Sequence, residues 1–263
     1  GTPGMEKTVS LIEHHFKTSG IKPYFDGSYK DTLKVFNRES YNLVGVIQAS
    51  APTNEYILLG AHWDHLGKTR HGQDSVYNGA NDNASGVATV LRMANELSKH
   101  KLQKNVLVAL FTEEESGLNG SEHLAKCLKA DSINLKYVLN YDMVGTRLYN
   151  NPGIVYITCY RNSNLATTVY QLLGEEFILN DRIDEEMGVF HLSDNYPFYQ
   201  EFHIPSHSFL TFNFENYPQY HQESDEFELL DIENMDRIID KSTQMVLKLL
   251  STDAKIELTE KKQ

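Results

Sequence analysis

Near-continuous apolar runs that alternate with amphipathic segments constrain the fold of this chain most strongly. The runs occupy residues 55–61, 105–111 and 137–141, and consecutive apolar positions are typical of strands covered on both faces. Residues 84–99 instead repeat apolar side chains along one stripe, as an amphipathic helix does. Strands that alternate with helices predict an α/β fold, in which a mostly parallel, mixed sheet is sandwiched by helices.

The other predicted elements fit the same architecture. We expect further helices over residues 5–18, 121–128, 165–173 and 231–250, and further strands over 32–36, 41–47, 153–160 and 206–212. The chain has no internal repeat and no low-complexity linker, so we predict one domain over residues 1–250. Residues 251–263 are polar and lysine-rich, which predicts a loosely held tail. We expect coil at residues 1–4.

The charge balance excludes several classes of protein. Among 263 residues, 24 Lys and Arg face 36 Asp and Glu, giving a formal net charge of −12 at pH 7. Binding to nucleic acid needs a basic surface, so we expect no nucleic-acid partner. Two cysteines are too few for a disulfide framework, and no apolar run approaches the ~20 residues that span a bilayer. These features leave a soluble acidic enzyme or binding domain.

Polar side chains capable of chemistry follow the predicted strands, at the point where each strand ends. In chain order they are His62, Asp64, Asp82 in a loop of small residues, the run Glu113-Glu114-Glu115, Asp142 and His221. Ligands of open α/β sheets bind beyond the carboxyl ends of the strands. The shared position of these side chains therefore predicts a site at one edge of the sheet.

Imidazole and carboxylate groups together suit zinc or a similar divalent ion. Two histidines and three carboxylates exceed the needs of one tetrahedral ion that keeps an open position, and they suit two ions that share a bridging carboxylate. One acid of residues 113–115 is then left to act as a general base. Each feature alone has an ordinary reading, since Asp82 resembles a helix N-cap and residues 113–115 resemble a solvated charge run. Solvated positions are expected for four other histidines: His14, His15, His100 and His123.

Five motifs taken together resemble the dizinc aminopeptidases of metallopeptidase family twenty-eight. In order they are His62-x-Asp64, Asn81-Asp82-Asn83-Ala84-Ser85-Gly86, Glu114-Glu115-Ser116-Gly117-Leu118-Asn119-Gly120-Ser121, Asn140-Tyr141-Asp142-Met143 and Tyr220-His221. The resemblance implies a zinc exopeptidase-like fold of the phosphorylase/hydrolase type, with two zinc ions per chain. It implies that one zinc is held by His62 and Asp142 and the other by Glu115 and His221. Asp82 would bridge both ions, and Glu114 would be the general base.

The resemblance also suggests residues around the metal ligands. Asp64 would accept a hydrogen bond from the His62 ring and so fix the aim of that ring. Asp194 lies in the segment Ser193-Asp194-Asn195, where the family usually has His in place of Asn195, and we expect Asp194 behind the ligands. Three aromatic residues are candidate walls of a hydrophobic substrate pocket, and each suits the core equally well: Phe190, Tyr217 and Tyr220.

The implied function is that of an extracellular or periplasmic aminopeptidase, which hydrolyses the first peptide bond of peptides with a free amino terminus. A glutaminyl cyclase of the same fold, with a single zinc, is the alternative enzyme. Such cyclases carry tryptophan just before the final histidine ligand, whereas Tyr220 stands there and Trp63 is the only tryptophan. That difference favours the peptidase. A non-catalytic binding relative is the third alternative, but such relatives usually have broken ligand sets, and the set is intact here.

Overall fold

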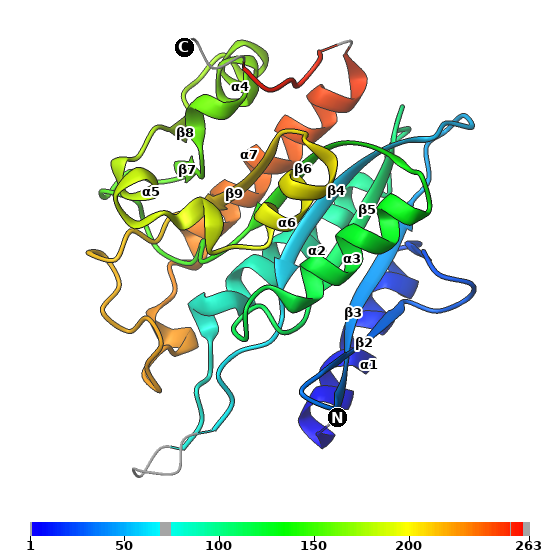
Figure 1. The fold of residues 1–263 in the computed structure, drawn as a ribbon. Helices are drawn as coiled ribbons and strands as arrows, with labels where there is room; N and C mark the ends of the chain where they lie inside the picture. The colour runs from blue at the N-terminus through cyan, green and yellow to red at the C-terminus, as the bar shows by residue number, and fades with distance from the viewer. Residues whose placement is uncertain (1, 69–74, 253, 260–263) are drawn as a thin grey trace.

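A mixed nine-stranded β-sheet forms the centre of the computed structural model, which describes residues 2–68, 75–252 and 254–259 (Figure 1). Across the sheet the strands lie in the order β1 (Lys22–Pro23), β3 (Arg38–Ile47), β5 (Asn105–Phe111), β4 (Glu55–His62), β6 (Asn134–Tyr141), β9 (Ser206–Leu210), β7 (Val155–Ile157) and β8 (Ile178–Leu179). The remaining strand, β2 (Lys30–Val35), pairs with β3 in an antiparallel hairpin.

Four parallel strands occupy the middle of this sheet. β5, β4, β6 and β9 run parallel to one another, whereas β3 pairs antiparallel with β5, and β7 with β9. These four strands correspond to the predicted strands at 105–111, 55–61, 137–141 and 206–212. Because parallel strands share one direction, their carboxyl ends meet at one edge of the sheet. The predicted fold class, a mostly parallel, mixed sheet between helices, is confirmed.

Helices cover both faces of the sheet (Figure 1). On one face pack α1 (Pro3–Thr18), α2 (Gly86–Leu97), α4 (Leu165–Leu173) and α7 (Ile232–Ser251), and on the other pack α3 (Asn119–Ala130) and α6 (Asn195–Phe202). Successive side chains of a strand point to opposite faces, so Ile57 and Leu59 of β4 join the first core and Leu58 joins the second. This two-sided burial explains why the central strands are apolar throughout. No helix in the described ranges is long and apolar enough to cross a membrane.

The chain differs from the sequence-based expectations mainly at its ends and in short helices. α1 begins at Pro3, not after a coil of four residues, because the Thr2 hydroxyl accepts a hydrogen bond from the Met5 amide and proline suits the first helical turn. Residue 1 lies outside the described residues. The helices α5 (Arg182–Met187) and α6 were not predicted, since six and eight residues are too few for a clear helical period.

The segment predicted as a tail begins inside α7, which ends at Ser251. Residues 254–259 lie beside residues 162–164, where Ser163 and Leu258 form a β-bridge and the Glu257 amide donates to Asn164. Residues 253 and 260–263 lie outside the described residues. The division of the chain at residue 250 stays a prediction.

Buried His207 on β9 should make the protein sensitive to acid. Its Nδ1 donates to the Thr158 carbonyl oxygen at 2.6 Å and its Nε2 accepts from the Ser163 hydroxyl at 2.7 Å, so the neutral ring is satisfied. Burial lowers the pKa of His207 from 6.5 to about 4. Below pH 6.5 this histidine is protonated in the unfolded chain, whereas in the folded chain it stays neutral down to about pH 4. The free energy of unfolding therefore falls as the pH decreases through this window.

We therefore expect His207→Gln to flatten the pH dependence of unfolding. Between pH 7 and pH 5 the wild type should lose about 2 kcal/mol more unfolding free energy than the variant. Urea titrations with a chelator present, which removes any contribution from bound metal, measure this difference. His14→Gln, at an exposed position of α1, is the matched control and should follow the wild type. An equal acid sensitivity of wild type and His207→Gln would contradict the assignment.

Candidate metal centre

Six side chains predicted as ligands or base gather beyond the carboxyl edge of the parallel strands. β4 ends at His62, β5 is followed by Glu114 and Glu115, and Asp142 follows β6. Asp82 lies in η1 (Ala80–Ser85), the helical turn that opens α2, and His221 lies in the segment after β9. Residues separated by more than 150 positions in the sequence thus meet because the strand ends share one edge.

The two carboxylate oxygens of Asp82 face different histidines. Oδ1 lies 3.3 Å from His62 Nε2, and Oδ2 lies 3.2 Å from His221 Nε2. Each histidine also faces a second acid, since His62 Nε2 is 3.6 Å from Asp142 Oδ1 and His221 Nε2 is 3.2 Å from Glu115 Oε2. The site is therefore two imidazole–carboxylate pairs joined through one shared carboxylate.

Asp225 fixes the backbone that carries Asp82. Its buried carboxylate accepts the amide protons of Asn81 at 2.8 Å and Asp82 at 3.0 Å, and also the Tyr217 hydroxyl at 2.7 Å. Because Asp225 lies four residues after His221, it ties the His221 segment to the Asp82 segment. Sequence reasoning gave this residue no role. In the sequence it is only an acidic residue among turn residues, close to the predicted ligand His221.

The two asparagines that flank Asp82 hold the segment that carries Asp142. Asn83 Oδ1 accepts the Met143 amide proton at 3.0 Å, and Asn81 Oδ1 accepts that of Gly145 at 2.8 Å. The Asp142 carboxylate is itself oriented by the Ser193 hydroxyl, which donates to Oδ2 at 2.7 Å. The Asn-Asp-Asn motif thus joins the Asp82 and Asp142 ligand segments.

Asp64 orients the glutamate loop more than the His62 ring. Its carboxylate accepts the backbone amides of Glu114 at 3.1 Å and Glu115 at 3.4 Å. The His62 ring Nδ1 lies 3.2 Å from the Asp64 main-chain carbonyl but 3.7 Å from its carboxylate, which is longer than a hydrogen bond. The expected ring–carboxylate contact is therefore replaced by a ring–carbonyl contact. Glu113, whose carboxylate accepts from the Ser116 hydroxyl, caps the turn that follows.

His65 belongs to the cluster and was missed in the sequence. Its Nδ1 lies 2.6 Å from Glu115 Oε1 and 3.9 Å from Asp82 Oδ2. The ring is nearly buried and lies edge-on to the His221 ring. In the sequence it is only a second histidine, three positions after His62. A histidine in a loop beyond a strand end is as readily interpreted as a solvated side chain as a member of a site.

Carboxylates dominate the charge around these histidines. Burial opposes protonation of His62, yet the nearby carboxylates, Glu114 first among them, raise its pKa well above the ordinary value. Hydrogen bonds to Asp82 and Glu115 raise the pKa of His221 to about 9. In the protein alone, this surplus of negative charge favours the protonated forms of His62 and His221. A divalent cation would balance the same charge with neutral imidazoles, which is the form that binds zinc, so the donor set fits that ion.

The pocket beside the cluster has an apolar wall, and only one of the three predicted wall residues lines it. Tyr220 does so, with its ring stacked on His221 at a centroid distance of 3.9 Å. Phe190 instead packs against Tyr199, and Tyr217 is held by its hydrogen bond to Asp225. Both were predicted as candidate pocket walls that suit the core equally well, and both lie in the packed interior. The cavity of about 60 Å³ has the following apolar lining: Met143, Val189, Leu192, Leu210, Phe212 and Phe214.

Asp194 and Asn195 lie behind the ligands in the protein interior. Burial raises the pKa of Asp194 to about 7, although His62 and Ser121 act to lower it. The Asn195 amide oxygen accepts from the Ser208 hydroxyl at 2.8 Å, and the Ser206 hydroxyl donates to the Asn195 carbonyl. Asn195 therefore joins α6 to β9 and does not line the pocket.

A larger hollow of about 660 Å³ lies at the opposite end of the strands. It is lined by Glu55 and Asn134, the first residues of β4 and β6, together with residues 254–258. Binding sites of open α/β sheets lie beyond the carboxyl ends of the strands. The smaller pocket beside the His–carboxylate cluster is therefore the candidate site.

The fold and the donor set define an α/β protein with a candidate divalent-metal centre at its sheet edge. The profile of peptidase family M28 matches residues 42–246, and the chain belongs to this family.

The match spans about a quarter or less of the length of the curated relatives. A probable zinc metalloprotease of Pyrenophora tritici-repentis is 34% identical over 103 residues, which are 39% of this chain and 24% of that relative. The LapA aminopeptidase structure of Legionella pneumophila has a TM-score of 0.70 at 23% identity, covering 94% of this chain and 65% of that one. A glutaminyl cyclase structure of Porphyromonas gingivalis also has a TM-score of 0.70, at 15% identity, covering 95% of this chain and 91% of that one. At such identities the two structures share the fold alone.

Proposed function

We propose that this protein is a zinc-dependent aminopeptidase with two zinc ions per chain. The observation that carries the proposal is the shared carboxylate of Asp82, whose two oxygens face two histidines that each have a second acid. His62 and Asp142 would hold one ion, and His221 and Glu115 the other. When bound, zinc supplies Lewis acidity, which polarises a substrate carbonyl and makes water a stronger acid near neutral pH.

Glu114 is the proposed general base. Its backbone amide is fixed by Asp64, and one of its carboxylate oxygens lies within 4.8 Å of the ligand atoms of His62 and Asp142. Burial raises the pKa of its carboxyl well above the ordinary value; His62 opposes this, whereas Asp194 and Asp142 add to it. A carboxyl with a raised pKa is suited to take a proton from the attacking water and pass it to the leaving amine near neutral pH.

The same acidic cluster is suited to the free amino terminus of a peptide. An ammonium group carries one positive charge, and the carboxylates of Glu114 and Asp142 face the pocket beside its apolar wall. Met143, Leu210 and Phe212 would contact the first side chain, which favours an apolar first residue. An extracellular or periplasmic location is part of the proposal, through the family resemblance.

Metal analysis combined with two substrates tests the proposal. Purified protein should contain at least two zinc ions per chain and should hydrolyse aminoacyl-nitroanilides, and a chelator should remove both the metal and the activity. A glutaminyl peptide serves as the second substrate because a cyclase of the same fold would release ammonia from it. Cyclisation with one bound zinc, in place of hydrolysis with two, would replace the peptidase proposal by the cyclase alternative.

His65 should act as a positioning residue for Glu115. Its Nδ1 donates to Glu115 Oε1, which leaves Oε2 facing His221. His65→Phe removes the donor but keeps a ring, and it should weaken zinc binding ~10–100-fold. His65→Asn keeps a donor near the same place and should retain most of the affinity. Competition against a chromophoric chelator measures both, and equal large losses in the two variants would instead make the imidazole itself a ligand.

A further inference from the structure

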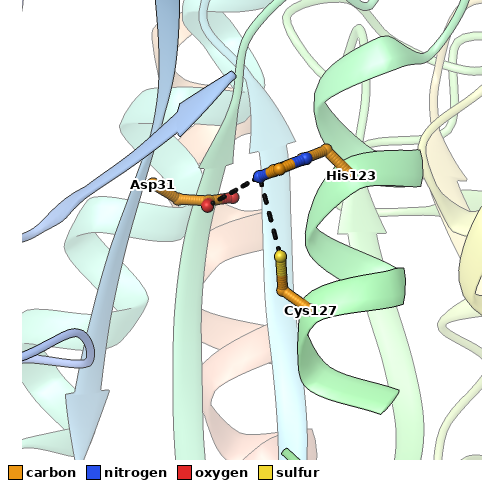
Figure 2. A group of neighbouring side chains, drawn as sticks. All are labelled: Asp31, His123 and Cys127. Atoms are coloured by element: carbon orange, nitrogen blue, oxygen red, sulfur yellow. Dashed lines mark hydrogen bonds and ion pairs between the residues drawn. The ribbon is translucent and has the colours of Figure 1, made fainter. Parts of the chain in front are cut away.

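A second group of metal-binding side chains lies between β2 and α3, outside the site described above. Asp31 comes from β2, and His123 and Cys127 come from α3 (Figure 2). His123 Nε2 lies 3.1 Å from Asp31 Oδ1 and 3.6 Å from Cys127 Sγ. The three ligand atoms lie within 4.8 Å of one another. His123 was expected to be solvated, but it contacts this pair.

Both contacts of His123 end on the same ring nitrogen (Figure 2). A catalytic relay needs the acid and the nucleophile on opposite ring nitrogens, so that one side orients the ring and the other takes a proton. Burial and the charges of Asp31 and Asp131 also raise the pKa of the Cys127 thiol, which is opposite to an activated nucleophile. The group is therefore not a cysteine-nucleophile site.

One ring nitrogen has a single proton or a single lone pair to offer to two partners. If Nε2 carries a proton it donates to Asp31 and offers the thiol proton no acceptor. If Nε2 is bare it can accept from the thiol, and two lone pairs then face each other across 3.1 Å. A cation placed where the three atoms converge would be attractive to the carboxylate, the imidazole and the thiolate together.

We propose that Asp31, His123 and Cys127 form a third metal site, which binds zinc or a similar borderline divalent cation. Thiolate, imidazole and carboxylate are all zinc ligands. Tetrahedral coordination at ordinary zinc bond lengths separates nitrogen from oxygen by roughly 3.3 Å and nitrogen from sulfur by roughly 3.6 Å, close to the 3.1 and 3.6 Å here. Three protein ligands leave a fourth position for solvent, and the partly exposed His123 side chain gives access to it.

The surroundings of the site hold its acid in place. Asn42 lies directly opposite Asp31 in the β2–β3 ladder, and its amide donates to Asp31 Oδ2 and to the Gly120 carbonyl, both at 2.8 Å. This leaves Oδ1 aimed at His123, which is the one side chain among the described residues that forms an ion pair with Asp31. His123 and Cys127 are four residues apart and so share one face of α3. A bound ion would clamp the β2–β3 hairpin to α3.

Cobalt(II) substitution tests the site independently of peptidase activity. Cobalt gives a thiolate-to-metal charge-transfer band only where a cysteine binds it, and the His–carboxylate centre contains no cysteine. Metal-free protein, with both thiols reduced and counted by thiol titration, is titrated with cobalt(II). The wild type should develop the band, and the band should reach its end point by three cobalt ions per chain, because the proposed two-ion centre takes up cobalt as well.

The chain supplies a matched control, because Cys159 is its only other cysteine. Cys159→Ser should keep the band, Cys127→Ser should lose it, and His123→Asn should weaken cobalt binding by roughly 10-fold or more. Circular dichroism checks that each variant is folded, and after dialysis against zinc Cys127→Ser should hold one ion fewer than Cys159→Ser. Absence of the band in reduced wild-type protein, or its persistence in Cys127→Ser, would overturn the proposal.

Discussion

Glu114→Gln should lose most of its turnover while it keeps its full content of zinc. Glutamine has the shape of glutamate and preserves the backbone hydrogen bond to Asp64, but it cannot take a proton from water. Loss of a general base costs ~10²–10⁴-fold in rate, so we expect kcat to fall by ~100-fold or more. Rates on an aminoacyl-nitroanilide and metal analysis of the same sample measure the two quantities.

Neighbouring glutamates provide the controls for this variant. Glu113→Gln should remain active because its carboxylate caps the turn through Ser116, a contact that glutamine can make. Glu115→Gln should lose zinc as well as activity, since Glu115 faces both His65 and His221. Near-normal turnover in Glu114→Gln would require another base, and loss of zinc in that variant would make Glu114 a ligand.

Asp82→Asn should have the other large effect, because it removes charge from both halves of the centre. The carboxylate faces His62 through one oxygen and His221 through the other, so the amide weakens both ion positions together. We expect zinc affinity to fall by more than the ~10–100-fold that is typical of changes to outer partners, and activity to fall with it. Isothermal titration with zinc measures this affinity.

Asp240→Asn is the matched control for Asp82→Asn. It makes the same chemical change on an exposed position of α7 and should bind zinc like the wild type. Wild-type affinity at either ion position of the His–carboxylate centre in Asp82→Asn would contradict the bridging role, because a shared carboxylate cannot be lost from one ion position alone.

The central strands could be predicted from the sequence because burial on two faces requires an almost continuous run of apolar residues. Residues 105–111 are all buried in the structure, and the predicted and observed strands coincide there. The elements at the edge of the sheet have a less distinct sequence pattern. β7 spans Val155–Ile157, shorter than predicted, because the chain turns into a 3₁₀ helix at Tyr160, and α6 contains Pro197 and mixed aromatic residues that hide its period.

The candidate ligands could be predicted because most follow a strand end and Asp82 lies in a loop of small residues that opens a helix, whereas their supporting residues could not. Asp225 acts through amide groups 144 positions away, at Asn81, and no local pattern encodes such a contact. His65 looks like a solvated loop histidine until Glu115 is placed beside it. Phe190 and Tyr217 were expected at the pocket because large aromatic residues suit a pocket wall and a core equally, and only packing separates the two.

A timed digest of one peptide in two forms tests the central claim most directly. The peptide has an apolar first residue, and its amino terminus is free in one sample and acetylated in the other. Acetylation removes the ammonium charge and adds bulk where the acidic pocket closes. We predict a mass-spectrometric ladder of products shortened one residue at a time from the free amino end, and essentially no cleavage of the acetylated form. Internal fragments, or equal cleavage of both forms, would contradict the account.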